Sequence, residues 1–456
     1  MSMNDTPRSE RVHIAFFGRR NAGKSSVVNA VTNQQVSIVS DIRGTTTDPV
    51  SKSMELLPLG PVVVIDTPGF DDEGTLGQMR VQRTKEILDR TDTAVLVAEA
   101  GAGLTACDRE LLKLFAEREI PCVLAWNKCD LEDAANPAEE SSAAKGDSAK
   151  GENSGQESLQ DKGFPALPEA SGVVRQIRVS ALTGENIDAL KEAIAEAGKA
   201  SAPEKVLAGD LFRPMDLVIL VIPIDFAAPK GRLILPQVQV LRDVLDHGGR
   251  ALCVRESELA QTLSDLREKG EKPALVITDS QAFRHVSSIV PEDIYLTSFS
   301  ILMARYKGVL KKQLEGVRAL RELKDGDTVL ISEGCSHHRQ CGDIGTVKLP
   351  AWIRAYSGKE LNFETSSGLS FPADLQKYAL IVHCGSCMLN EKEVAARNRR
   401  AAQQGVPITN YGMTIAEVNG ILPRALKVLP EAGLKSGTAP GAAGDMRNAA
   451  GDRLKG

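Results

Sequence analysis

Two groups of cysteine and histidine side chains could together hold a soft metal. The first group is Cys335-Ser-His337, and the second is His383-Cys-Gly-Ser-Cys387. Two cysteines separated by two residues can bind one metal from a single tight turn, and a thiolate from a distant segment can complete the cage. Thiolate ligands prefer zinc or an iron–sulfur cluster to hard cations. The spacing therefore predicts Cys335, Cys384 and Cys387 as ligands, and it fits a structural zinc site as well as a cluster.

The fourth position of this metal site stays open at the level of the sequence. Either one of four further donors occupies it, or it is exchangeable. The four candidates are His337, Cys341, Asp343 and His383. The remaining four cysteines stand singly in apolar or motif contexts, where we expect small core residues. They are Cys107, Cys122, Cys129 and Cys253.

A second constellation lies near the N-terminus and is typical of phosphate binding. The apolar run Val12 to Phe17 predicts a strand, and Gly18-Arg-Arg-Asn-Ala-Gly-Lys-Ser25 follows it directly. Such a loop surrounds phosphates with backbone N–H groups, its lysine reaches the β and γ oxygens, and its serine can hold Mg²⁺. The expected binding residues are Gly18, Asn21, Ala22, Gly23, Lys24, Ser25 and Ser26.

Three more motifs follow in the order expected for a GTPase, each at the end of an apolar run. Asp66-Thr67-Pro-Gly69 places Asp66 near Mg²⁺ and the Gly69 amide near the γ-phosphate. In Asn127-Lys128-Cys-Asp130, the Asp130 carboxylate can accept hydrogen bonds from N1 and N2 of guanine, which adenine does not offer in that pattern. Ser180-Ala181 can support the guanine O6 atom. The sequence therefore predicts GTP as the nucleotide, with Lys24, Asp66 and Gly69 in catalytic positions.

The switch segment narrows the type of GTPase. Gly44-Thr-Thr-Thr-Asp48 resembles the switch of the Era/TrmE-like GTPases, in which a threonine completes the Mg²⁺ shell; the alignment selects Thr46, which we also expect to be catalytic. Phe70 stands where Ras-type enzymes carry a water-orienting glutamine. Related GTPases with this gap use an asparagine at the position of Asn21 to bind K⁺. The alternative is that Asn21 only braces its own loop.

Composition limits the class of protein. The chain has 456 residues, a hydrophobic share of 42% and a formal net charge of −5, so no basic excess argues for nucleic acid. No apolar run approaches the ~20 residues that cross a bilayer. Eight cysteines in a chain of this length fit a reducing cytosol better than a disulfide framework. We expect a cytoplasmic protein that binds neither membrane nor nucleic acid.

The pattern of apolar runs predicts an α/β protein of several domains. The strand-like runs Thr328 to Ile331 and Leu380 to Val382 lead into the two halves of the metal motif, and Phe299 to Leu323 has a long helical pattern. We expect a P-loop GTPase domain at 11–200, a small α/β domain at 211–290 and a metal-binding α/β domain at 291–428. Polar composition predicts disorder in an insertion at 132–163 and in the tail at 429–456.

Four segments stand out beside the GTPase motifs: Glu333-Gly-Cys-Ser-His337, Asp343-Ile-Gly-Thr-Val-Lys348, His383-Cys-Gly-Ser-Cys387 and Pro407-Ile-Thr-Asn-Tyr-Gly-Met413. Through these segments and the GTPase motifs, the chain resembles the HydF family of FeFe-hydrogenase maturation GTPases over roughly residues 11 to 425. The resemblance implies a 4Fe–4S cluster held by three cysteines with one exchangeable iron site, and it favours iron over zinc. It also implies that 211–290 is a dimerisation domain.

The function that this resemblance implies is that of a scaffold and carrier. A homodimer would receive a two-iron precursor with CO and cyanide ligands from two radical-SAM maturases and deliver it to the apo-hydrogenase. GTP binding and hydrolysis would change its affinity for these partners, because ordering of switch loops is the usual output of a GTPase. The alternative is an Era/TrmE-like GTPase of tRNA modification or ribosome assembly that carries a structural zinc site.

Overall fold

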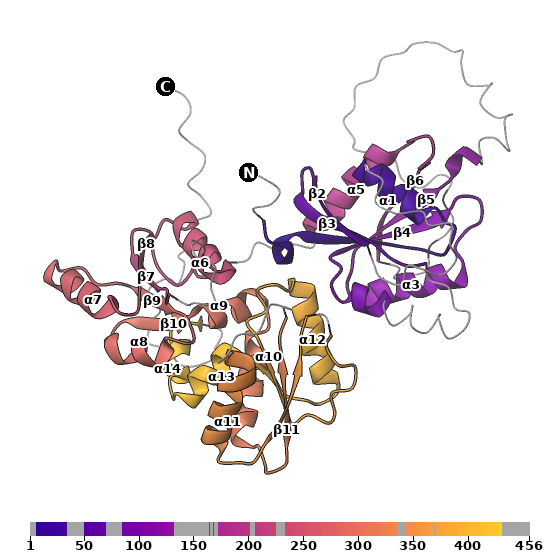
Figure 1. Cartoon of the computed structure of the whole chain (residues 1–456). Helices are drawn as coiled ribbons and strands as arrows, with labels where there is room; N and C mark the ends of the chain where they lie inside the picture. Colours follow the sequence, from indigo (N-terminus) through magenta and orange to yellow (C-terminus); the bar gives the residue numbers. More distant parts are fainter. Residues whose placement is uncertain are drawn as a thin grey trace, which may run out of the picture. The chain divides into compact units, whose positions relative to one another are not determined.

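Figure 1 shows a computed structural model of the chain. The chain forms two compact units, Met1–Pro203 and Glu204–Gly456. The insertion 132–163 and nearly all of the tail 429–456 lie outside the described residues, and so do Thr46, Phe70, Cys335, His337 and Cys341. The residues described are 6–33, 50–69, 84–131, 164, 167, 172–200, 206–224, 233–334, 343–368 and 370–430.

The first unit contains a six-stranded sheet with the strand order β2-β3-β1-β4-β5-β6. Only β2 runs antiparallel to its neighbour, and the other pairs are parallel. This confirms the predicted P-loop α/β fold. The strands are β1 (Val12–Phe17), β2 (Val50–Leu56), β3 (Gly60–Asp66), β4 (Thr93–Glu99), β5 (Cys122–Asn127) and β6 (Val173–Arg178).

Helices cover both faces of this sheet because its parallel strands are apolar on both sides. Along β1, Ile14 and Phe16 face one core and Ala15 and Phe17 face the other. The first core includes residues of α1 (Lys24–Thr32) and α5 (Ile187–Ala200), and the second includes residues of α3 (Ala106–Glu117). The phosphate loop therefore leaves a rigid, buried strand and enters a packed helix.

The second unit begins with a parallel four-stranded sheet, ordered β10-β9-β7-β8. Strand β10 is the last of the four in the sequence and lies beyond the expected domain boundary at 290/291, but it pairs with β9. This sheet therefore extends past that boundary. The strands are β7 (Leu217–Val221), β8 (Arg250–Val254), β9 (Leu275–Thr278) and β10 (Tyr295–Ser298). The helices are α6 (Leu235–Asp246), α7 (Leu259–Glu268) and α8 (Phe283–Ile289).

A second parallel sheet follows in the order β12-β11-β13-β14. In Figure 1, α12 lies on one side of β11, and α10, α11 and α13 lie on the other. The strands are β11 (Thr328–Ser332), β12 (Asn362–Ser366), β13 (Leu380–His383) and β14 (Ile408–Asn410). The helices are α9 (Phe299–Tyr306), α10 (Leu310–Val317), α11 (Leu349–Ser357), α12 (Glu391–Gln403), α13 (Tyr411–Val418) and α14 (Leu422–Leu426), with a π-helical turn at Ile344–Lys348.

The long helix expected over Phe299 to Leu323 is interrupted at Gly308, which has a φ of +67°. The Gly308 amide donates to the Arg305 carbonyl, and the Val309 amide donates to the Ala304 carbonyl. This is a Schellman turn, which glycine favours because it has no Cβ to clash at positive φ. Helix α9 therefore ends at this turn, and α10 starts in a new direction.

One hydrophobic core joins the two sheets of the second unit. It contains Ile219 and Ile277 from the first sheet, Val329 and Val382 from the second, and Met413 from α13. At Gly412, a Cβ would lie only 1.8 Å from the Ser300 hydroxyl oxygen, so α13 closely approaches the first turn of α9. None of the described helices is both long and apolar enough to span a bilayer.

Candidate functional site

The phosphate loop has a backbone conformation that depends on two glycines. Gly18 has a φ of +145°, and a Cβ at this position would lie 2.4 Å from the Val97 carbonyl oxygen. Gly23 has a φ of +83°, and its Cβ would lie 2.2 Å from Nδ2 of Asn127. Both positions combine positive φ with close packing, so other residues would be strained there. Gly69 also lies close to this loop, since a Cβ added there would lie 3.1 Å from the backbone nitrogen of Arg20.

Asn127, at the end of β5, ties the phosphate loop to the guanine side of the site. Its Nδ2 donates to the Ala22 carbonyl oxygen at 3.0 Å, and its Oδ1 accepts from the Ala181 amide at 3.1 Å. The side chain is 2% exposed. Three motifs that are far apart in the sequence therefore share one buried amide.

The magnesium side of the site is formed by Lys24, Ser25 and Asp66. The Ser25 hydroxyl donates to Oδ2 of Asp66 at 2.7 Å, and Nζ of Lys24 lies 3.7 Å from Oδ1 of Asp66. This Oδ1 atom is buried and has no hydrogen-bond partner among the described residues. A buried carboxylate oxygen beside a serine hydroxyl suits Mg²⁺, which prefers oxygen ligands.

The guanine side presents a second buried carboxylate oxygen. Oδ1 of Asp130 is buried without a hydrogen-bond partner in the described part of the chain, as expected of an atom that would accept from a base. Lys128 has a φ of +67°, and its Nζ lies 3.2 Å from Oε1 of Glu99. Oε2 of Glu99 in turn accepts from Arg19 at 3.2 Å. Glu99 was not predicted from the sequence, because no motif marks the end of β4.

Thr67, Ser180, Asn21 and Ser26 are further residues that the sequence predicts to bind the nucleotide. Thr67 anchors its segment by donating from Oγ1 to the Phe16 carbonyl at 2.7 Å. Ser180 is buried, and its Oγ accepts from the Thr183 amide at 3.1 Å. Asn21 is exposed and has a φ of +67°. Ser26 is exposed on the first turn of α1.

The two strands that lead into the metal motif are direct neighbours. Ser332 at the end of β11 pairs with His383 at the end of β13, and the Cys384 amide donates to the Ser332 carbonyl at 2.8 Å. Cys335 and His337 lie outside the described residues. Within the stretches that are described, no three histidine, cysteine, aspartate or glutamate side chains lie close enough together to hold a metal.

Two backbone amides donate hydrogen bonds to the sulfur of Cys384. The Gly334 amide donates to Sγ at 3.0 Å and the Ser386 amide at 3.4 Å. Burial raises the pKa of the Cys384 thiol, and these two donors oppose that rise. Burial also raises the pKa of the Cys387 thiol. N–H donors directed at sulfur favour the thiolate, the form in which cysteine binds metals.

His383 has a different environment from the one predicted for a metal ligand. Its Nε2 accepts from Nη1 of Arg397 at 2.9 Å, and a guanidinium can only donate. Its Nδ1 therefore carries the proton and lies 2.9 Å from the Ser386 hydroxyl and 3.1 Å from the Cys384 carbonyl. Burial, with the Arg397 charge second, lowers the pKa of His383 to about 3. Neither ring nitrogen has a lone pair left for iron in this arrangement, so here His383 supports the loop.

Arg397 is a site residue that sequence reasoning missed. It is 2% exposed. Besides His383, it donates from Nε to Oε1 of Glu393 at 2.8 Å and from Nη2 to the Gly368 carbonyl at 2.8 Å. Its guanidinium carbon lies over the Phe371 ring, 5.0 Å from the ring centre. One buried cation thus fixes the start of the cysteine loop.

Acidic and phenolic groups also lie near Cys384. The Tyr411 hydroxyl donates to Oε1 of Glu333 at 3.4 Å. Burial raises the pKa of Tyr411, and the charges of Glu333, Cys384 and Asp343 add to this effect. Asp343 uses Oδ2 to accept from the amide of Thr346 at 2.9 Å, so it caps the π-helical turn as well as being a candidate fourth ligand.

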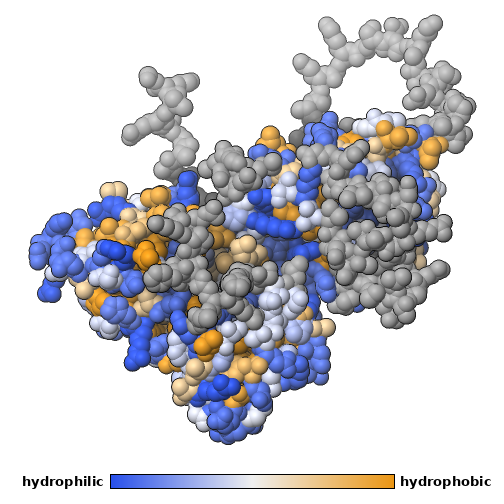
Figure 2. Space-filling view, in the orientation of Figure 1, coloured by the Kyte–Doolittle hydropathy of each residue, from blue (hydrophilic) through white to orange (hydrophobic). Residues whose placement is uncertain are grey.

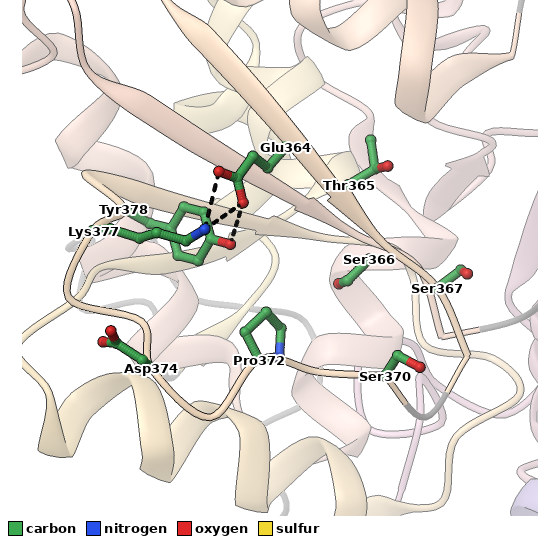
Figure 3. Close-up of a pocket in the computed structure, with 9 residues that line it drawn as sticks. All are labelled: Glu364, Thr365, Ser366, Ser367, Ser370, Pro372, Asp374, Lys377 and Tyr378. Atoms are coloured by element: carbon green, nitrogen blue, oxygen red, sulfur yellow. Dashed lines mark hydrogen bonds and ion pairs between the residues drawn. The ribbon is translucent and has the colours of Figure 1, made fainter.

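A shallow hollow of about 640 Å³ opens beside the outer strand β12 (Figure 3). Figure 3 shows Glu364 pointing toward Lys377 and Tyr378, whose Nζ and hydroxyl groups both donate to its Oε2 at 2.7 Å. These three polar groups of the hollow are therefore paired with one another. The site chemistry lies instead at the carboxyl ends of β11 and β13.

Comparison with known proteins agrees with this division of the chain. The profile of the 50S ribosome-binding GTPase family matches residues 13–128. The profile of the Hydrogen maturase F dimerization domain matches residues 207–308, and that of the Hydrogen maturase F tetramerization domain matches residues 311–428. The three matches follow one another without overlap.

Curated relatives match the GTPase part of the chain. The tRNA modification GTPase MnmE of Laribacter hongkongensis is 33% identical over 189 residues, which are 41% of this chain and 35% of the relative. GTPase Der of a Nitratiruptor species is 33% identical over 126 residues, 27% of each protein. The chain thus spans about a third of the length of these relatives. The solved structure of Era from Aquifex aeolicus covers 53% of this chain and 92% of its own, at 17% identity and a TM-score of 0.30, too low to support a structural argument.

The fold of the first unit, its phosphate loop and its Asp66 and Asp130 carboxylates define a P-loop GTPase that binds GTP with Mg²⁺. The two profiles that match the second unit are specific to one family of such GTPases. The chain belongs to the hydrogen maturase F family. This assignment favours hydrogenase maturation over the alternative of tRNA modification or ribosome assembly.

Proposed function

We propose that this protein is a GTP-hydrolysing scaffold that binds a 4Fe–4S cluster and delivers a two-iron precursor to apo FeFe-hydrogenase. Membership of the hydrogen maturase F family supports the process. The contacts of the two sites support the roles of the individual residues.

The nucleotide site supports hydrolysis through charge and position. Lys24 and Ser25 both contact the buried Asp66 carboxylate. This carboxylate would hold the Lys24 ammonium group in place to bind the phosphates and the Ser25 hydroxyl in place to bind Mg²⁺. Phosphoryl transfer depends mainly on such positioning and on compensation of negative charge. Thr46 would complete the Mg²⁺ shell, and the Gly69 amide would approach the γ-phosphate. Asn21 would help to bind K⁺.

The observation that carries the cluster proposal is the pair of amide hydrogen bonds to Sγ of Cys384. The donor set fits a cluster, because amide donors stabilise thiolates and hydrogen bonds to sulfur are a regular feature of cluster sites. Cys384 and Cys387 would hold the cluster together with Cys335. A 4Fe–4S cluster held by three cysteines supplies one iron with an open coordination position. His337, Cys341 and Asp343 remain the candidates to occupy it, or it stays exchangeable.

The second unit also offers a surface for homodimer formation. On α6, Val238 is 46% exposed and Leu245 is 56% exposed, and Ile234 lies one turn before Val238. The spacing of Val238 and Leu245 puts these two side chains on one face of the helix, and Ile234 is its N-cap residue. The neighbouring strand β8 is an edge of its sheet. Figure 2 shows hydrophobic surface in the region of β7, β8 and α6, and the dimerization profile includes this region.

The partners that we propose are two radical-SAM maturases, which would supply the precursor, and the apo-hydrogenase, which would receive it. A GTPase typically changes its affinity for partners when its switch loops order around the γ-phosphate. We propose that GTP serves this exchange of partners in the cytoplasm.

The experiment that tests the cluster site is an iron and sulfide assay on protein purified without oxygen. Alanine replacements of Cys335, Cys384 and Cys387 are each expected to remove the cluster, since three thiolates leave no spare ligand. The matched control is Cys253→Ala, which removes an exposed cysteine on β8. GTP hydrolysis should persist in all four variants while hydrogenase activation fails in the first three. Full iron and sulfide in those three variants would refute the assignment of the cluster to these cysteines.

A further inference from the structure

A buried lysine lies at the end of α9, directly before the Schellman turn. Lys307 is the C-cap residue of this helix, and its amide donates to the Met303 carbonyl at 3.0 Å. Lys307 is only 7% exposed. A long, charged side chain is rarely buried to this degree unless its charge has a role or a partner.

The Lys307 ammonium group reaches the cysteine loop. Nζ donates to the Leu389 carbonyl oxygen at 2.8 Å and also to the Ser386 carbonyl oxygen. Cys387 lies between these two residues in the sequence. Both acceptors belong to the segment that turns from β13 toward α12, and Ser386 has a φ of +57° within it. One cation therefore holds both sides of the turn that carries the second cysteine.

The charge of Lys307 acts on the Cys387 thiol as well as on the backbone. Burial raises the pKa of the Cys387 thiol, and the Lys307 ammonium is the largest influence in the opposite direction. Two or three thiolates in a buried site carry negative charge that favours a cation nearby. The carbonyl contacts fix where that cation lies.

Lys307 comes from a different part of the chain than the cysteines. It falls within the match to the dimerization domain, at 207–308, whereas Ser386, Cys387 and Leu389 fall within the match to the tetramerization domain, at 311–428. The two carbonyl contacts of Lys307 place the end of α9 against the cysteine loop. The cysteine site is thus incomplete within residues 311–428.

We propose that Lys307 is a positioning residue of the metal site: it fixes the turn that carries Cys387 through two carbonyls and sets positive charge near that cysteine. This inference rests on the proposed cluster-binding function. Its consequence is that the charge at position 307 sets the reduction potential of the cluster, because net charge near a cluster and solvent exposure govern that potential.

The test compares two substitutions in the full-length protein. Lys307→Gln keeps a donor for a carbonyl but removes the charge, whereas Lys307→Arg keeps the charge and has several donors. The matched control is Arg305→Gln on the same helix, since Arg305 donates to Asp210 at 2.8 Å. The measurements are iron and sulfide per chain, the electron paramagnetic resonance spectrum of the reduced protein, and its midpoint potential in a redox titration.

The expected result is a more negative midpoint potential in Lys307→Gln, with values close to the wild type in Lys307→Arg and Arg305→Gln. Loss of the cluster from Lys307→Gln but not from Lys307→Arg would support the same role. An unchanged potential in Lys307→Gln, or equal loss of the cluster from both Lys307 variants, would overturn it. If the wild type itself holds no iron and sulfide, the proposed function fails first and this inference fails with it.

Discussion

The side-chain amide of Asn127 donates to the Ala22 carbonyl oxygen at 3.0 Å, so the residue that begins the guanine motif also holds the phosphate loop. Its carbonyl accepts from the Ala181 amide at 3.1 Å. The geometry of the loop and that of the base site are therefore linked through one side chain.

Asn127→Ala should weaken GTP binding at least tenfold. It removes two buried hydrogen bonds and leaves their partners unsatisfied, a cost of about 2–4 kcal/mol. The measurement is a fluorescence titration with a labelled guanine nucleotide. The matched control is Asn362→Ala, because this exposed asparagine also donates to a backbone carbonyl, that of Gly326 at 3.0 Å. Equal affinity in wild type and Asn127→Ala would contradict the linking role.

Lys24→Ala should lower GTP turnover by at least about 100-fold, the order of magnitude for loss of one charge partner in a preorganised site. Release of phosphate under saturating GTP is the measurement. Lys113→Ala is the control, since this lysine is 76% exposed on α3. Turnover in Lys24→Ala that stays near the wild-type rate would place hydrolysis elsewhere.

GTP hydrolysis should be slow and should be faster in K⁺ than in Na⁺. The reasons are the exposed Asn21 on the phosphate loop and the phenylalanine at position 70, where Ras-type enzymes have glutamine. Asn21→Ala should lose the difference between the two salts while Ser26→Ala keeps it. Equal wild-type rates in Na⁺ and K⁺ would exclude a role for potassium and leave the GTPase assignment intact.

Arg397→Met should destabilise the second unit by about 3 kcal/mol, because it leaves Glu393 buried and without its cation. It also removes the donor to Nε2 of His383. The control is Arg400→Met on the same helix, where the guanidinium lies 5.7 Å from the Phe371 ring centre and the expected loss is about 1 kcal/mol or less. Thermal unfolding of the metal-free protein measures both effects, and similar losses would argue against the buried network.

Val238→Asp and Leu245→Asp should each shift the protein from dimer toward monomer at micromolar concentration. A carboxylate on the exposed apolar face of α6 would lose its water in an interface. Sedimentation velocity gives the measurement. Val174→Asp is the control, because Val174 is 56% exposed on β6 in the first unit. An unchanged dimer in both α6 variants would move the interface to another surface.

Most of the nucleotide site could be predicted from the sequence, because its residues come in contiguous motifs at strand ends. The loop around Lys24, the Asp66 segment and the Asn127 segment each combine a local pattern with a local structure. Glu99 escaped prediction, since its ion pairs with Arg19 and Lys128 arise only from the neighbouring positions of β1, β4 and β5. The binding role of Thr46 stays a prediction.

The surroundings of the proposed metal site were less predictable for the same physical reason. Cys384 and Cys387 form a motif, but the groups that surround them are distant in sequence. Lys307 contacts residues 79 and 82 positions further along the chain. The edge strand β12 was missed because its segment Asn362–Ser366 is largely polar, and the end of α9 was missed because one glycine gives a weak signal inside a helical pattern.

The core that joins the two sheets of the second unit limits how this protein can be divided by recombination. A chimera that exchanges only residues 309–430 with a relative would cut through a continuous hydrophobic interior. It would also separate Arg424 from the carbonyls of Ser287 and Val290, to which it donates at 2.9 and 2.7 Å. Exchange of the whole segment that begins at Glu204 respects the boundary between the two units. The GTPase can be transplanted as a module, whereas the parts that match the dimerization and tetramerization profiles are inherited together.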